Sequence, residues 1–171
     1  MDKRGAYFFV LDALIGGAIF IISLIVIISS FMNAPQTRQT LTQSDDIMNI
    51  MMSTKIIEFR NDYVEYLKDT NQIVNHDNTI FEQIVEFHYE GMENHTYNLT
   101  KSILNNLIGE QYGISYGIVN MSNGNTFVIY NRSMNDINNS RFVLTSRRIT
   151  FYAPNETVLI GPDVTELRIW N

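Results

Sequence analysis

Residues 3–32 read KRGAYFFVLDALIGGAIFIISLIVIISSFM, and this stretch decides how the rest of the chain is organised. From Ala6 to Met32 it is apolar over about 27 residues, and the only acid within it is Asp12. A helix rises about 1.5 Å per residue, so this segment would be about 40 Å long, more than the roughly 30 Å hydrocarbon core of a bilayer. The sequence therefore predicts a transmembrane helix over residues 6–32.

A cleavable secretory signal peptide would look different. Its apolar region covers roughly 7 to 15 residues and ends at a small-x-small cleavage site. The best match to such a site here is Ala34 preceded by Met32, and it is a poor one. We therefore expect the apolar segment to be retained as a single-pass anchor. Lys3 and Arg4 flank its N-terminus, and the positive-inside rule keeps such residues in the cytoplasm, so the rest of the chain should be extracytoplasmic.

Composition restricts what the remainder of the chain can be. Of the 171 residues, those that follow the apolar segment are enough for one domain with its own core. The absence of cysteine excludes disulfide scaffolds, thiolate zinc sites and cysteine nucleophiles. A net charge of -6 with only 12 Lys and Arg argues against nucleic acid as a partner. The basic pair Arg147-Arg148 is more simply explained by an exposed strand.

After the basic leader at residues 1–5 and the apolar helix, residues 33–39 form a joint, where Pro35 opposes continuation of the helix. Apolar residues then recur at spacings of three and four, with Asn61 as an interruption. This pattern predicts an extracytoplasmic domain over residues 40–171 that begins with a helical region, residues 40–109. Its helices are expected at residues 40–69, 79–89 and 97–107.

Beyond Gly109 the apolar period shifts toward two, and β-branched and aromatic residues predominate. The Asn123-Gly124 pair between two such runs is a strong hairpin signal. Residues 153–156 predict a second hairpin, and residues 161–163 predict a turn into a last strand. The expected fold is therefore α+β: the transmembrane helix, the helical region, and an antiparallel sheet in residues 110–171. Its strands are expected at residues 112–121, 126–130, 141–152, 157–160 and 164–170.

Asp12 is the most unusual residue of the apolar segment. A carboxylate costs roughly 2.5 to 3.5 kcal/mol at the bilayer centre and less near the interface. In one interpretation, Asp12 is a hydrated interfacial acid or pairs with Lys3 or Arg4 of a neighbouring chain. In another, removal of residues 1–5 exposes a new α-amino group on Ala6, and Asp12 of an adjacent helix neutralises it. Such pairing would set the stagger between subunits.

The sequence from Lys3 to Leu14, KRGAYFFVLDAL, resembles the class III signal peptide of type IV prepilins and archaeal pilin-like proteins. In that family a membrane aspartyl peptidase cuts after the glycine, and the helices then pack as a filament core. The resemblance implies cleavage between Gly5 and Ala6, a pilin-like plan of helix followed by antiparallel sheet, and assembly into a surface filament. The partners implied are membrane lipid, the prepilin peptidase and other pilin-like subunits.

The match covers about the first 32 residues and departs from the bacterial pattern. Bacterial type IV pilins carry Glu at the fifth mature position, which here is Val10, while the acid Asp12 comes two positions later. This spacing is closer to archaeal proteins with a Phe-Phe-x-Leu-Asp-Ala-Leu start. We therefore expect an archaeal-type register.

Two further features agree with an oligomer on the cell surface. Ala13, Gly16 and Gly17 give the helix a face of small residues that allows close approach of another helix, although glycine is also common in membrane helices generally. Six Asn-x-Ser/Thr sequons fall in the part predicted to lie outside, as expected for a glycoprotein, although an Asn-rich chain also produces sequons by chance. The sequons are Asn94, Asn98, Asn120, Asn131, Asn138 and Asn155.

No motif points to an enzyme, a cofactor or a metal. The three histidines have neither the helical spacing nor the close partners of metal ligands, so we expect surface or partly satisfied side chains. Neither a Gly-x-Ser-x-Gly elbow nor a phosphate-binding glycine loop is present. The acids Asp45, Asp46, Glu82 and Glu86 are expected on solvated helix faces.

The sequence thus favours a pilin-like structural subunit. The alternative is a signal-anchored sensor or binding domain that does not polymerise and that should contain a well-formed pocket. A membrane-tethered hydrolase is the third and weakest hypothesis, because the sequence offers no catalytic constellation.

Overall fold

The computed structural model describes residues 3–32, 37–133, 137–155 and 157–171. Within these ranges, side chains are described for residues 11–29 and from residue 43 onward. The chain forms two compact units, residues 1–38 and residues 39–171, and the second is called here the α+β domain. Residues 33–36 of the predicted joint lie outside the described residues, and its last three residues belong to a helix.

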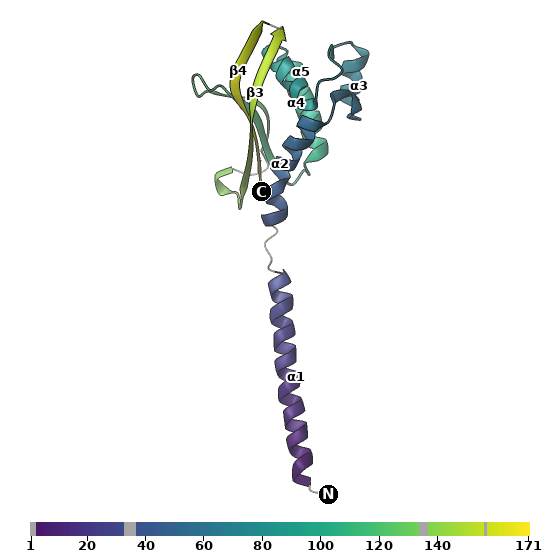
Figure 1. The fold of residues 1–171 in the computed structure, drawn as a ribbon, viewed down its shortest axis with the longest axis vertical. Coiled ribbons are helices and arrows are strands. Elements are labelled where there is room, and N and C mark those ends of the chain that lie inside the picture. The colour runs from purple at the N-terminus through teal and green to yellow at the C-terminus, as the bar shows by residue number, and fades with distance from the viewer. Residues whose placement is uncertain (1–2, 33–36, 134–136, 156) are drawn as a thin grey trace. The chain divides into compact units, whose positions relative to one another are not determined.

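Helix α1, Lys3–Met32, makes up most of the described part of the first unit (Figure 1). It contains the helix predicted at residues 6–32. Its segment Leu11–Ser29 is long and apolar enough to cross a membrane, and no other segment of the described residues is. Such an N-terminal helix is compatible with either a membrane anchor or a signal sequence.

The prediction of one long helix at residues 40–69 is wrong. The structure has two helices there, α2 (Thr37–Ser53) and α3 (Asp62–Asp69), with the short 3-10 helix η1 (Ile56–Glu58) between them. Two further helices follow, α4 (Ile80–Tyr89) and α5 (Glu93–Leu107). Helix α4 agrees with the prediction, and α5 begins four residues earlier than expected.

The break after α2 has a tertiary cause. Lys55 pairs with Thr79 in an isolated antiparallel bridge, and the Thr54 carbonyl accepts a hydrogen bond from the Ile80 amide at 3.0 Å. This pairing takes the chain out of the helical conformation. Asn61, the interruption in the apolar pattern, then starts α3, because its side chain accepts a hydrogen bond from the Tyr63 amide at 2.9 Å.

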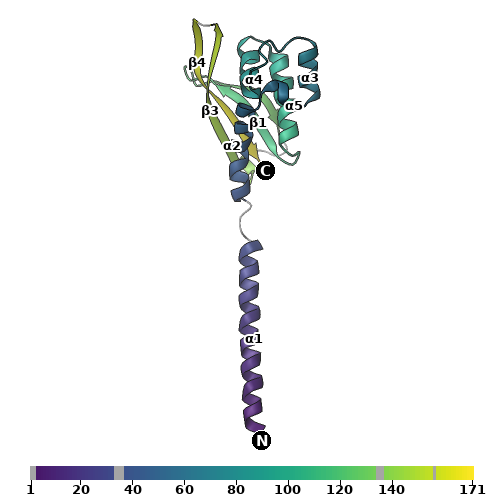
Figure 2. The same ribbon diagram turned by 45° about the vertical axis from the view of Figure 1, so that its right-hand side comes forward.

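Four antiparallel strands form one sheet in the order β2-β1-β4-β3. The prediction of an α+β chain with a C-terminal antiparallel sheet is therefore confirmed. Helices α4 and α5 pack together, α5 contacts β2 and α4 contacts β3, while α3 contacts α5 on the side away from the sheet (Figure 2). The strands are β1 (Gly113–Val119), β2 (Thr126–Arg132), β3 (Val143–Asn155) and β4 (Val158–Trp170).

The turn predicted at residues 161–163 is wrong, because β4 continues through these residues as a single strand. Strand β1 pairs with β4 only from Val164 onward, so the first part of β4 pairs with β3 alone. Proline lacks an amide donor and is tolerated where a strand has a free edge, and Pro162 lies in such a part. Gly161 adopts a φ of 112°, which glycine tolerates.

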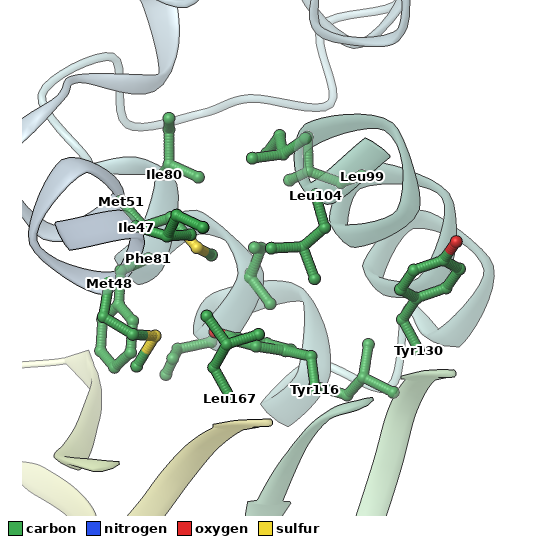
Figure 3. Close-up of a cluster of buried hydrophobic side chains, with 14 of the residues drawn as sticks. Ile47, Met48, Met51, Ile80, Phe81, Leu99, Leu104, Tyr116, Tyr130 and Leu167 are labelled. Atoms are coloured by element: carbon green, nitrogen blue, oxygen red, sulfur yellow. The ribbon is translucent and has the colours of Figure 1, made fainter. Parts of the chain in front are cut away.

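The core lies between the sheet and the helices (Figure 3). Alternate residues of the central strands point into it, including Tyr116 of β1 and Leu167 of β4, which are paired neighbours. Met48 and Met51 enter from α2, and Leu99 and Leu104 enter from α5. Packing of the helices on the sheet therefore stabilises the domain. The chain has no cysteine, so no disulfide contributes.

Candidate functional site

The residues predicted to act in assembly lie together on α1. Asp12 and Gly16 are four positions apart, as are Ala13 and Gly17, and such pairs face the same side of a helix. The four residues therefore form one continuous surface, called here the assembly patch, with an acid beside three small residues. A Cβ added at Gly16 or Gly17 would meet no atom within 4 Å, so another helix has room to approach.

The surface of α1 is apolar and open around this patch as well. Every described side chain from Leu11 to Ser29 is exposed, including Phe20 at 69% and Leu14 at 68%. An apolar surface of this extent is typical of a segment that contacts lipid or another protein.

The predicted cleavage site lies near the start of α1. Gly5 and Ala6 both belong to the helix, while Met1 and Asp2 of the leader lie outside the described residues. Cleavage between Gly5 and Ala6 remains a prediction.

Two of the six sequons lie on α5. Asn94 is exposed and Asn98 is half-buried, and both carry threonine two positions later. Thr96 and Thr100 are buried at 2% and 0% exposure, and the Thr96 hydroxyl donates to the Met92 carbonyl. N-glycosylation acceptors lie in surface loops, so the folded domain does not present these two sequons in that form.

The other four sequons lie outside the helical layer. Asn131 is on β2, Asn138 is in the short 3-10 helix η2 (Ile137–Asn139), and Asn155 ends β3, all three exposed. Asn120 is half-buried where β1 turns toward β2, and its side chain accepts the Ser122 amide at 2.9 Å. Asn120, Asn138 and Asn155 come closer to the loop position of an acceptor than Asn131, which lies within a paired strand.

Among the described residues, no group of three or more histidines and acids could hold a metal ion. The His95 ring nitrogen Nδ1 lies 2.9 Å from the Tyr63 hydroxyl, and His76 is exposed. His88 packs against the ring of Phe127, with the ring centroids 4.8 Å apart, and burial lowers the pKa of His88. These positions are those of surface and partly satisfied side chains.

The sequence did not mark Asp163 as a buried acid, because it was assigned to a turn. Its carboxylate is 5% exposed and accepts hydrogen bonds from the Tyr89 hydroxyl and from the Met121 amide, the latter at 3.1 Å. Burial and the bond to Asp163 raise the pKa of the Tyr89 hydroxyl. One carboxylate oxygen thus joins β4 to α4 and the other joins β4 to the turn after β1, which is a structural role.

A groove with three glutamates lies between α4 and the far end of β3, with a volume of about 530 Å³. Each carboxylate already has a partner in the domain: Glu82 closes the capping box of α4, Asn78 donates to Glu86, and the Tyr152 hydroxyl donates to Glu90 at 2.9 Å. Burial raises the pKa of Glu86. The prediction that Glu86 lies on a solvated helix face is wrong, because its side chain is half-buried, while Glu82 is exposed as predicted.

A second groove, of about 630 Å³, opens between α3 and α5 and is called here the α3–α5 groove. Two tyrosines, Tyr63 and Tyr66, line it, together with side chains of Arg, Asn, Asp and Ser alone. Sequence analysis missed this groove, because α3 was assigned to a longer helix. The signal that would have helped is Asn61, whose polar side chain interrupts the apolar pattern and in the structure starts α3.

Neither a protein-family model, a curated protein nor a solved structure matches the chain. Two features of the described residues are candidate binding surfaces: the apolar helix with its assembly patch, and the polar α3–α5 groove.

Proposed function

We propose that the chain is a pilin-like structural subunit of an archaeal-type surface filament. The observation that carries the proposal is the contrast within the chain between α1, whose apolar side chains are exposed from Leu11 to Ser29, and an α+β domain with a core of its own. The domain does not need α1 to complete its core. Helix α1 is then available to lie in lipid before assembly and against other α1 helices afterwards.

Processing links these two states. A prepilin peptidase cuts after Gly5, and the new α-amino group of Ala6 takes the positive charge of the mature N-terminus. Asp12 of an adjacent subunit pairs with this group inside the filament core, where an isolated carboxylate would be costly. The small residues of the assembly patch allow the two backbones to approach closely.

The same proposal sets the topology of the precursor. Lys3 and Arg4 hold the N-terminus in the cytoplasm, α1 crosses the membrane once, and the α+β domain is extracytoplasmic. The plan of a helix followed by an antiparallel sheet is that of pilin-like proteins. Glycans on the exposed sequons would then coat the outside of the filament.

The decisive experiment is determination of the N-terminal residue of the protein recovered from native membranes and from shed material, by intact mass. A chain that starts at Ala6 supports the proposal. A chain that starts at Met1 or Asp2 overturns it.

A second experiment tests the assembly patch. Asp12→Asn keeps the shape of the side chain and removes its charge, so membrane insertion should persist while incorporation into filaments falls at least about tenfold, an effect of about 1.4 kcal/mol. Ser23→Ala in the same helix is the matched control, because the Ser23 hydroxyl donates within its own helix, to the Ile19 carbonyl. Normal filaments from Asp12→Asn would remove the pairing role of Asp12.

The alternative is a signal-anchored binding domain that does not polymerise, and the α3–α5 groove favours it. The two functions share the anchor and the topology. An uncut leader together with the absence of filaments would move the assignment to the anchored binding domain.

A further inference from the structure

We propose that the α3–α5 groove binds a neutral saccharide, with a pyranose ring against Tyr66 and its hydroxyls on Arg60, Asp62 and Asn106. This property goes beyond assembly and does not depend on it.

The aromatic side of the groove offers an open ring face. The rings of Tyr63 and Tyr66 lie with centroids 5.6 Å apart and planes inclined by 32°, and Tyr66 is 50% exposed. The C–H face of a pyranose is apolar and covers such a ring, which removes apolar surface of both partners from water. The hydroxyl of Tyr63 is occupied by the ring of His95, so Tyr63 contributes its ring and not its polar end.

The polar side offers donors and acceptors that the domain itself leaves unused. Within the described part of the chain, the side chains of Arg60, Asp62 and Asn106 have no hydrogen bond or ion pair, and all three are exposed. A carboxylate accepts from two neighbouring hydroxyls, a guanidinium donates in a planar fork, and an amide does both. This is the set of partners that adjacent sugar hydroxyls require.

The base of the groove is held in place by the rest of the domain. Asn61 accepts the Tyr63 amide and the Ser102 hydroxyl, which ties α3 to α5. Asn105 accepts the Tyr130 hydroxyl at 2.9 Å and the Arg132 guanidinium at 2.8 Å, which ties α5 to β2. A groove that is ordered before binding loses less conformational entropy when the ligand arrives.

The lining also argues against other ligands. One arginine and one aspartate balance each other, so the groove has no excess positive charge for a phosphate or sulfate. The lining includes no aliphatic side chain, so a peptide would find no pocket for an apolar anchor. Neutral compounds rich in hydroxyl groups are the class that fits both the aromatic side and the polar side of the groove.

The test uses the full chain in lipid nanodiscs, because glycosidic detergents would compete for the groove. Maltotriose, mannotriose and chitotriose are titrated separately by calorimetry, with trialanine as the peptide probe. We expect at least one trisaccharide to bind with a Kd below about 1 mM and trialanine not to bind.

Variants then assign the binding to the groove. Tyr66→Ala should weaken the affinity at least about tenfold, whereas Tyr97→Ala, which alters a tyrosine of α5 outside the groove that is 42% exposed, should change it less than about twofold. Asp62→Asn keeps the volume of the side chain and should also weaken binding, so it decides the matter if Tyr66→Ala does not fold.

Three outcomes would overturn the proposal: no trisaccharide binds at about 10 mM, trialanine binds in their place, or the groove variants bind as well as the parent chain. A chain that binds the sugar but forms no filaments would support this inference and contradict the proposed assembly. A chain that forms filaments but binds no sugar would do the opposite.

Discussion

Helix α1 and the α+β domain use apolar residues in opposite ways. Leu24 of α1 is 47% exposed and Ile25 is 60% exposed, whereas Leu99 and Leu104 of α5 are fully buried. In the domain, apolar side chains stabilise the fold of the single chain by leaving water. In α1 the same residue types are exposed and belong to no core of the single chain.

This difference predicts which property a substitution in each region should change. A substitution in the domain should change the free energy of unfolding, while a substitution in α1 should change insertion or assembly and leave the domain folded. The following three experiments test this separation, starting with the largest expected effect.

Leu104→Ala should reduce the free energy of unfolding of the α+β domain by about 2–5 kcal/mol, because a fully buried leucine leaves a cavity. Denaturant titration of the full chain, followed by the fluorescence of the single Trp170, measures the change. Leu24→Ala in α1 is the matched control and should leave the unfolding midpoint unchanged. Equal destabilisation by both variants would show that the two regions fold as one.

Gly117→Ala should cost about 1–3 kcal/mol, because an added Cβ would lie 2.6 Å from the Phe127 carbonyl oxygen and backbone cannot move cheaply. Gly16→Ala adds the same methyl group to α1, where it meets no atom within 4 Å, so the domain should remain as stable as before. Unfolding curves and filament incorporation are measured for both variants. A Gly16→Ala chain that assembles normally would argue against close helix packing at the assembly patch.

His88 should give the domain a small pH dependence that α1, which has no histidine, does not share. Burial lowers the pKa of His88 in the folded state, so the unfolded chain takes up a proton more readily. The free energy of unfolding should therefore fall as the pH decreases from about 6.5 through the folded pKa. His88→Gln should remove this dependence of the free energy of unfolding on pH. Glu86, whose pKa is raised, has the opposite effect, but it is present in both proteins and cancels when the variant is compared with the parent. Identical pH profiles of the parent and the variant would show that His88 does not cause the pH dependence.

Sequence patterns predicted those parts of the fold that depend on local signals. The apolar run of α1, the helix at α4 and the Asn123-Gly124 hairpin are examples, and each agrees with the structure. The long helix at residues 40–69 failed because its break depends on Lys55 meeting Thr79, which is distant in sequence. The prediction of a turn at residues 161–163 failed because Pro162 can lie within β4, where β1 does not pair with that strand.

The candidate sites divide in the same way. The assembly patch follows from helical spacing alone, so residues 12–17 could be chosen from the sequence. The α3–α5 groove combines side chains some 40 positions apart, such as Asn61 and Ser102, and only the packing of α3 against α5 brings them together. Asp163 was missed for the same reason, since its partner Tyr89 lies on another element.

The strand order β2-β1-β4-β3 has a consequence for biogenesis. Strand β4 is synthesised after the other three strands of the sheet but lies in its interior, and β1 gains its second neighbour only when β4 arrives. During translation, α1 leaves the ribosome before any strand, while the sheet cannot form completely until β4 has emerged. A nascent chain stalled before β4 would therefore expose the apolar faces of β1 and α5 to quality-control proteases, even though α1 was already complete.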